Sequence, residues 1–288
     1  MRRKTVIIFL SLTLLVVLLA GAEDSGARKA FARLRLAEVY FRNGADEEAY
    51  DQLRVIMTDC PGTDADFQAR KRMVQELLAD AEQGGVGEEV LNRVEEIVLG
   101  AVTADLLPVK RRATFVCELA ESLRGNSMHA GAVKVARTAL AELDGDEPRE
   151  GESVAPIARM LYGLGVDYQC LGEHEQSASA YEAAATRYPD DMCGAHAHLR
   201  LGSYYRDKDP ERAEAEFRVS LTYGENSDVR WQAHYYLADF LVKQGREEEA
   251  MSYLEALVPA DKGEWSRRAQ ELYSGIISAG QYANAKER

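Results

Sequence analysis

The sequence repeats itself along most of its length, and this repetition constrains the fold more than any other feature. In its clearest copy the recurring set is Leu161, Leu164, Gly165, Tyr168, Gly172, Ser177, Tyr181, Ala184 and Pro189. The first four members follow the i, i+3, i+4, i+7 spacing of one stripe of an α-helix, and Ser177, Tyr181 and Ala184 follow it on a second helix. Each copy therefore predicts a hairpin of two helices.

Nearly the same set returns in five further copies and one partial copy between residues 30 and 284. With Ala158 as position 1, position 8 is a small residue in most copies. The position-8 residues are Ala37, Leu78, Ala120, Gly165, Gly202, Ala238 and, in the partial copy, Tyr273. Intervals between them are longer before Gly165 than after it, which predicts less regular repeats in the N-terminal half.

Small residues at positions 8 and 20 are predicted to let the two helices of a hairpin approach closely. Glycines at position 15 mark the expected end of the first helix in the left-handed conformation, which glycine adopts at least cost. These glycines are Gly44, Gly85, Gly172, Gly245 and Gly280. A single hairpin leaves an apolar side uncovered, so hairpins of this kind are stable only when stacked. The sequence predicts an all-α fold, an α-solenoid of stacked antiparallel helix hairpins.

This set of positions resembles the tetratricopeptide repeat, and the clearest copy departs from the family pattern only at Ser177, where alanine is usual. The resemblance implies a right-handed superhelix with the first helices lining a concave face. It also implies a non-catalytic protein that binds an extended or helical segment of a partner protein.

The N-terminus reads as an export signal. Residues 1–4 are basic after Met1, residues 5–19 are almost wholly apolar, and Ala20, Gly21 and Ala22 follow. This order predicts a secretory signal cleaved after Ala22. The alternative is an uncleaved membrane anchor over residues 5–22, because about 18 apolar residues can span a bilayer. Both interpretations place the body outside the cytoplasm, in the periplasm or cell envelope. No cysteine follows the small residues, so lipidation there is not expected.

Charge and loop composition refine this interpretation. The 35 basic and 48 acidic residues give a formal charge of −13, which disfavours nucleic acid as a partner. The acidic clusters at residues 46–48, 88–89 and 247–249 each begin a predicted second helix, where carboxylates stabilise the positive end of the helix dipole; cation binding is the alternative.

Residues 144–153 are polar and acidic and predict an exposed loop. It would separate irregular repeats at 27–143 from regular repeats at 154–288.

Residues that carry chemistry do not form a recognisable constellation. His196 and His198 are two apart on a predicted helix and so point to different faces, which excludes the i, i+4 pair of a metal site. We expect no metal, no cofactor and no catalytic residue. The cysteines, Cys60, Cys117, Cys170 and Cys193, occupy unrelated repeat positions and are expected to be unpaired, buried thiols.

In the tetratricopeptide-repeat family the partner contacts positions 2, 5, 9, 12 and 13 of the first helices. In the three best C-terminal copies, Leu199 stands at one position 5 and Cys170 at one position 13. The resemblance thus implies a partner-binding set of Arg159, Tyr162, Gln169, His196, Ser203, Arg206, Gln232, Tyr235, Asp239 and Lys243. Tyr162 and Tyr235 are candidate anchors, and Arg159 and Arg206 are candidates to grip carboxylates. The alternative is that these are ordinary solvated helix residues.

The family's lysine and asparagine clamp for chaperone tails is absent from positions 5 and 9, so those tails are not expected partners. An export signal followed by such repeats is similar in plan to bacterial envelope-assembly and cell-division proteins. The leading hypothesis is therefore an exported interaction scaffold in one of these processes. The alternative is a membrane-anchored accessory or regulatory subunit of a larger membrane complex.

Overall fold

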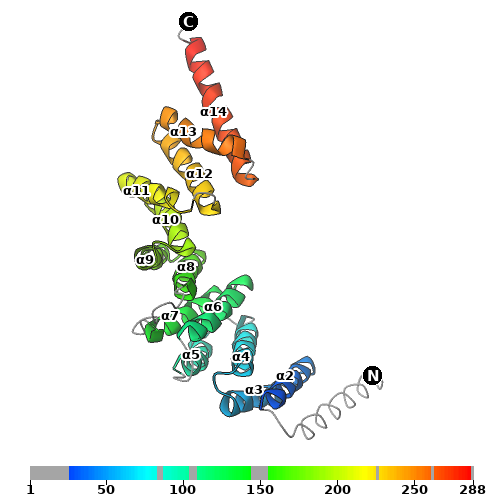
Figure 1. Ribbon diagram of the computed structural model, residues 1–288. Helices are drawn as coiled ribbons and strands as arrows, with labels where there is room; N and C mark the ends of the chain where they lie inside the picture. The colour runs from blue at the N-terminus through cyan, green and yellow to red at the C-terminus, as the bar shows by residue number, and fades with distance from the viewer. Residues whose placement is uncertain are drawn as a thin grey trace, which may run out of the picture. The chain divides into compact units, whose positions relative to one another are not determined.

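The computed structural model describes residues 26–82, 87–103, 109–143, 155–224, 227–260 and 263–286. Within these ranges the chain forms α-helices and one short 3-10 helix, and no β-strand (Figure 1). The predicted all-α fold is confirmed. The predicted signal or anchor at residues 1–22 and the predicted loop at residues 144–153 lie outside the described ranges and stay predictions.

The contacts divide the chain into two compact units, Met1–Met160 and Leu161–Arg288. In the first unit three hairpins follow one another. Their helices are α2 (Gly26–Arg42) with α3 (Asp46–Asp59), α4 (Asp64–Glu82) with α5 (Glu88–Val102), and α6 (Val109–Gly125) with α7 (His129–Leu143). Neighbouring hairpins are stacked, because α4 contacts both α2 and α3, and α6 contacts both α4 and α5.

The second unit begins within α8 (Ala155–Cys170) and continues the alternation of first and second helices. Its further elements are α9 (His174–Arg187), α10 (Met192–Tyr205), α11 (Pro210–Leu221), α12 (Asp228–Lys243), α13 (Glu247–Leu257), the 3-10 helix η1 (Val258–Ala260) and α14 (Glu264–Lys286). Within this unit α10 contacts its own second helix α11 and the next first helix α12, and α12 likewise contacts α13 and α14. The predicted α-solenoid of stacked hairpins is thus the observed fold.

None of the helices in the described ranges combines the length and apolarity needed to cross a membrane.

Three of the glycines predicted to end a first helix do so in the left-handed conformation, and Gly280 does not. Gly44, Gly172 and Gly245 have φ of 70°, 79° and 73°, in the left-handed region. In the third hairpin Ser127 takes the same conformation at φ 62° without a glycine. The prediction for Gly280 is wrong, because α14 continues through it to Lys286. A glycine inside a helix costs only about 1 kcal/mol relative to alanine, which does not end a helix whose following residues favour helix. Gly85 lies outside the described residues.

The three acidic clusters lie at the starts of second helices, as the sequence predicts. They occupy the first turns of α3, α5 and α13, which begin at Asp46, Glu88 and Glu247. None of these helices has a side-chain cap at its N-terminus, so the carboxylates in the first turn are the groups that balance the helix dipole.

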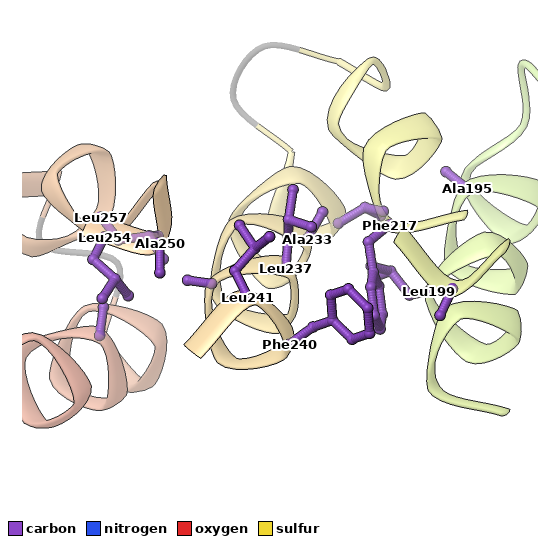
Figure 2. Close-up of a cluster of buried hydrophobic side chains, with 14 residues drawn as sticks. Ala195, Leu199, Phe217, Ala233, Leu237, Phe240, Leu241, Ala250, Leu254 and Leu257 are labelled. Atoms are coloured by element: carbon purple, nitrogen blue, oxygen red, sulfur yellow. The ribbon is translucent and has the colours of Figure 1, made fainter. Parts of the chain in front are cut away.

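The two helices of a C-terminal hairpin meet where an aromatic ring covers a glycine. A Cβ atom added to Gly202 would lie 2.5 Å from Cε1 of Phe217, and one added to Gly165 would lie 2.5 Å from Cε1 of Tyr181. Phe217 is fully buried and continues into a cluster with Leu199 of α10 and Phe240 of α12, which Figure 2 shows. The ring at position 24 therefore needs the space that glycine leaves at position 8.

The second hairpin departs from this arrangement. Leu78 stands at position 8 and is fully buried, and its side chain reaches Gly131 of α7, where an added Cβ would lie 2.5 Å from Cδ1 of Leu78. In the same unit α5 packs chiefly on α7, the second helix of the next hairpin. A large residue at position 8 thus fills a space between hairpins and is accommodated by a glycine there.

Two buried arginines bond to carbonyls in the C-terminal part of α5. Arg70 of α4 donates from Nη1 to the carbonyl of Ile97 over 2.8 Å and from Nε to Asp66 over 2.7 Å. Asp66 has no exposed surface and also accepts the Gly62 amide over 2.7 Å. Arg112 of α6 donates to the carbonyl of Val102. The last four carbonyls of a helix lack intrahelical partners. Val102 is the last residue of α5 and Arg112 supplies its partner, whereas Arg70 bonds to a carbonyl further inside the helix.

The glycine–ring contact gives a test of the packing. Gly202→Ala places a methyl group against the Phe217 ring and should lower the free energy of unfolding by about 1–3 kcal/mol. Adding Phe217→Leu reproduces the Ala37–Leu53 and Ala238–Leu254 pairs of the first and sixth hairpins. The double variant should therefore be more stable than the sum of the two single changes, by about 1 kcal/mol, in urea denaturation.

Gly275→Ala is the matched control, because this helical glycine has open space around its missing Cβ. It should stabilise the protein by up to about 1 kcal/mol. Strictly additive effects of Gly202→Ala and Phe217→Leu would contradict the proposed contact.

Candidate functional site

The predicted partner-binding residues of the second unit lie on its first helices. Tyr162 and Gln169 are on α8, His196 and Ser203 on α10, and Arg206 follows the last residue of α10. The remaining members are on α12: Gln232, Tyr235, Asp239 and Lys243.

Arg159 is separated from this set, because it belongs to the first unit. Its Nε lies 2.9 Å from a carboxylate oxygen of Glu121 and donates to Sγ of Cys117 over 3.0 Å. Burial raises the pKa of the Cys117 thiol. The predicted role of Arg159 in gripping a partner's carboxylate therefore competes with an internal carboxylate already in place.

Between α8 and α10, Tyr162 and His196 are in contact. Their rings meet edge to face with centroids 5.8 Å apart, and the Tyr162 ring also lies 5.6 Å from that of Tyr181. Arg200 of α10 donates from Nε to the Tyr162 hydroxyl over 3.4 Å. Burial lowers the pKa of His196 and the charge of Arg200 lowers it further, so the imidazole is neutral at pH 7.

Between α10 and α12, the predicted residues neutralise one another. Arg206 lies 3.0 Å from Asp239, and Lys243 lies 3.0 Å from the same carboxylate oxygen. Arg206 and Asp239 are both largely buried, with 19% and 22% of their side chains exposed. The arrangement joins two hairpins, and it leaves Arg206 with less capacity to bind an external carboxylate than the sequence implied.

Between α12 and α14, the predicted anchor Tyr235 packs against other aromatic rings. Its centroid lies 5.8 Å from that of Tyr236 and 5.9 Å from that of Trp265. Burial raises the pKa of the Tyr235 hydroxyl. Tyr235 is therefore half-buried and contributes to the attachment of α14 as well as to the surface.

These contacts connect α8, α10, α12 and α14 in order, and we call the surface they form the first-helix face of the second unit. The sequence-based assignment was wrong at Leu199, which is only 4% exposed and belongs to the core cluster. On α10 the accessible stripe includes Arg200 and Tyr204 beside the predicted Ser203. Sequence analysis missed both residues, because they stand at positions 6 and 10, next to the family positions 5 and 9.

Arg200 and Tyr204 line a pocket of about 220 Å³ in the second unit. Gln169 and Ser203, both predicted, line it as well, together with His174, Ser177, Ala178 and Tyr181. Tyr181 donates to Gln169 over 3.2 Å, and Ser177 donates to the carbonyl of Gly165 over 2.8 Å. The pocket therefore combines side chains from α8, α9 and α10.

The same repeat positions line a pocket in the first unit. Phe31, Leu34 and Glu38 occupy positions 2, 5 and 9 of the first copy, and Arg72 and Gln75 occupy positions 2 and 5 of the second. All five border a pocket of about 260 Å³, and Phe31 is 58% exposed. Sequence analysis applied these positions only to the C-terminal copies and so missed this site, although the spacing alone would have found it.

The remaining sequence expectations concern histidine and cysteine. His198 lies 2.6 Å from Glu216 through Nδ1, and His234 stacks on Trp231 with centroids 5.9 Å apart. No group of three or more His, Cys, Asp or Glu side chains in the described part of the chain is placed to hold a metal ion. The cysteines are unpaired. Cys117 is buried as expected, but Cys170 is exposed and Cys60 and Cys193 are only partly buried, so the expectation of buried thiols was wrong for these three.

Comparison with known proteins identifies the repeats. The family model described as tetratricopeptide repeat matches residues 203–264, which span α11, α12 and α13. The chain contains tetratricopeptide repeats. No curated protein matches the sequence.

Several solved structures align with the chain at low identity. The apo form of RapI aligns with a TM-score of 0.58 at 13% identity, covering 99% of this chain and 81% of RapI. PilF of Pseudomonas aeruginosa aligns with a TM-score of 0.47 at 14% identity, covering 85% of this chain and 97% of PilF. A tetratricopeptide repeat protein of Parabacteroides merdae gives 0.43 at 14% identity, covering 88% and 87% of the two chains. The likeness to RapI concerns the fold alone.

The packing of Tyr235 makes a prediction that separates structure from binding. Tyr235→Ala removes ring contacts with Trp265 and Tyr236, so it should lower the free energy of unfolding by about 1–2 kcal/mol. It should also shift tryptophan emission to longer wavelength as Trp265 becomes hydrated. Ser203→Ala, at an exposed position of the same face, is the control and should leave both unchanged. Unaltered stability in Tyr235→Ala would show that the ring serves the surface alone.

Proposed function

We propose that this chain is an exported, non-catalytic scaffold that holds a segment of a partner protein on the first-helix face of the second unit. Tetratricopeptide repeats form protein-interaction scaffolds, so the coarse role follows from the repeats. The finer proposal is supported by one observation. Tyr162, His196, Arg206, Asp239 and Tyr235 contact side chains of adjacent first helices, so the four helices present one continuous polar and aromatic surface.

A surface of this kind suits an elongated partner segment. Half-buried tyrosines offer large contact area at low entropic cost, with a polar tip. The ion-paired Arg206 and Asp239 are held in place before any partner arrives, which reduces the ordering cost of binding. The segment would run across successive hairpins and exchange contacts from one first helix to the next.

A position-specific crosslinking experiment tests the location of binding. A photo-reactive phenylalanine analogue at Ser203, on the first-helix face, should yield a discrete adduct in intact cells of the source organism. The matched control is the same analogue at Val219 of α11, which is 44% exposed on a second helix. Tyr162→Ala, combined with the analogue at Ser203, should reduce the adduct severalfold. Equal adducts from Ser203 and Val219 would refute binding on the first-helix face.

The proposed location outside the cytoplasm, in envelope assembly or cell-division coordination, rests on residues 1–22. We expect the mature protein to begin at Glu23, because small residues stand at the two positions that signal cleavage requires. Mass spectrometry of the purified protein's N-terminus measures this directly. An intact Met1 in a membrane fraction would favour the other candidate, a membrane-anchored accessory or regulatory subunit. An intact chain in the cytoplasm would overturn both.

A further inference from the structure

The pocket bordered by Gln169, Tyr181, Arg200, Ser203 and Tyr204 differs in charge from the rest of the chain. The chain carries 48 acidic residues against 35 basic ones. Yet no aspartate or glutamate is among the residues that line this pocket. Its charged or titratable lining consists of the Arg200 guanidinium, the His174 imidazole and the tyrosine hydroxyls. Although the chain as a whole is acidic, the lining of this pocket contains no carboxylate.

Arg200 also differs from the arginines around it. Four other arginines of the second unit lie close to a carboxylate: Arg206 to Asp239, Arg212 to Glu182, Arg218 to Glu214 and Arg246 to Glu249. For Arg200, no carboxylate among the described residues lies within ion-pair distance. Its one hydrogen bond goes from Nε to the Tyr162 hydroxyl over 3.4 Å, which is longer than a strong charge-assisted bond. The forked guanidinium retains the donors that bind a carboxylate in bidentate fashion.

A second cation stands beside the same pocket. Nζ of Lys208 lies 3.7 Å from the centroid of the Tyr204 ring. Tyr204 is one of the lining residues, so the ammonium is held close to the pocket by a cation–π contact. Arg200 thus lines a space that has no carboxylate in its lining, and Lys208 is held against one of the lining rings.

The hydrogen bonds within the pocket leave donors available. Tyr181 donates to Oε1 of Gln169 over 3.2 Å, which leaves the Gln169 amide nitrogen to donate elsewhere. The Ser203 hydroxyl donates to the carbonyl of Leu199 over 3.0 Å, so its oxygen is oriented and fixed. At about 220 Å³ the pocket is smaller than sites for drug-sized ligands, about 300–1,000 Å³. It suits one side chain or one chain terminus.

We propose that this pocket binds a carboxylate of the partner segment, with the Arg200 guanidinium as the principal contact and Lys208 and Gln169 as supporting donors. The inference rests on the proposed function and specifies the partner: a segment that presents a glutamate-like side chain or a free C-terminus where it crosses α8 and α10. Neither Arg159 nor Arg206, the sequence-predicted grips, fills this role, because Glu121 and Asp239 already pair with them.

Small probes test the pocket without the partner. The Nε–Hε resonance of Arg200 in the ¹⁵N-labelled mature protein, identified by its loss in Arg200→Gln, is followed by NMR. N-acetylglutamate α-amide presents a side-chain carboxylate, N-acetylglycine presents a terminal one, and N-acetylglutamine α-amide is the neutral control at equal ionic strength. We expect saturable shifts of Arg200 with at least one carboxylate probe and none with the neutral one. The tighter of the two probes identifies the source of the carboxylate.

Matched variants complete the test. Arg200→Gln should weaken probe binding tenfold or more, and Arg200→Lys should weaken it less. Arg212→Gln, which removes an arginine already paired with Glu182, should leave it unchanged. Circular dichroism checks that each variant is folded. Equal shifts of all arginine resonances, or none at Arg200, would overturn the inference.

The two proposals fail separately. Probe binding without any adduct from the analogue at Ser203 would refute partner binding on this face and retain the carboxylate pocket. Undiminished adduct formation in Arg200→Gln would retain the scaffold and refute the pocket's part in partner recognition.

Discussion

The contact between position 8 of a first helix and position 24 of its second helix sets how closely each hairpin closes. Where position 8 is glycine, as at Gly165 and Gly202, an aromatic ring from the second helix lies directly over it. Where position 8 is alanine, as at Ala37 and Ala238, the partner is a buried leucine. In these four hairpins the summed volume stays nearly constant while its division between the helices changes. Close packing of protein interiors favours this, because an added methyl group has no free space to enter. The third hairpin, with Ala120 and Ala136 at these positions, does not follow this rule.

This contact also decides which stripe of each first helix is left for the surface. Residues turned toward the second helix and the next hairpin are buried, and the opposite stripe stays accessible. On α8 and α12 the accessible stripe includes position 5, where Tyr162 and Tyr235 are half-buried. On α10 position 5 is Leu199, which enters the cluster with Phe217 and Phe240. With Leu199 buried, the accessible stripe of α10 passes through Arg200, Ser203 and Tyr204.

The sequence predicts those properties that depend on local spacing. Helix boundaries, the left-handed glycines at Gly44, Gly172 and Gly245, and the acidic first turns all follow from residues within a few positions of one another. The ion-pair partner of a charged side chain cannot be predicted from local spacing. Arg206 pairs with Asp239 and Arg246 with Glu214, both across adjacent hairpins. Such pairing depends on side-chain direction between helices, which the spacing within one helix leaves open. The availability of Arg200 could be recognised only once the partners of its neighbours were known.

The second hairpin, α4 with α5, closes by different means. Leu78 at position 8 reaches Gly131 on α7 instead of making room for its own second helix. Helix α5 packs chiefly on α7, and the buried arginines Arg70 and Arg112 bond to its Ile97 and Val102 carbonyls. A buried arginine is tolerated only when its charge and donors are satisfied, and Asp66 with the α5 carbonyls does this for Arg70. The second hairpin is thus held by a buried polar network as well as by apolar packing, whereas the hairpins of Gly165, Gly202 and Ala238 divide apolar volume between their two helices.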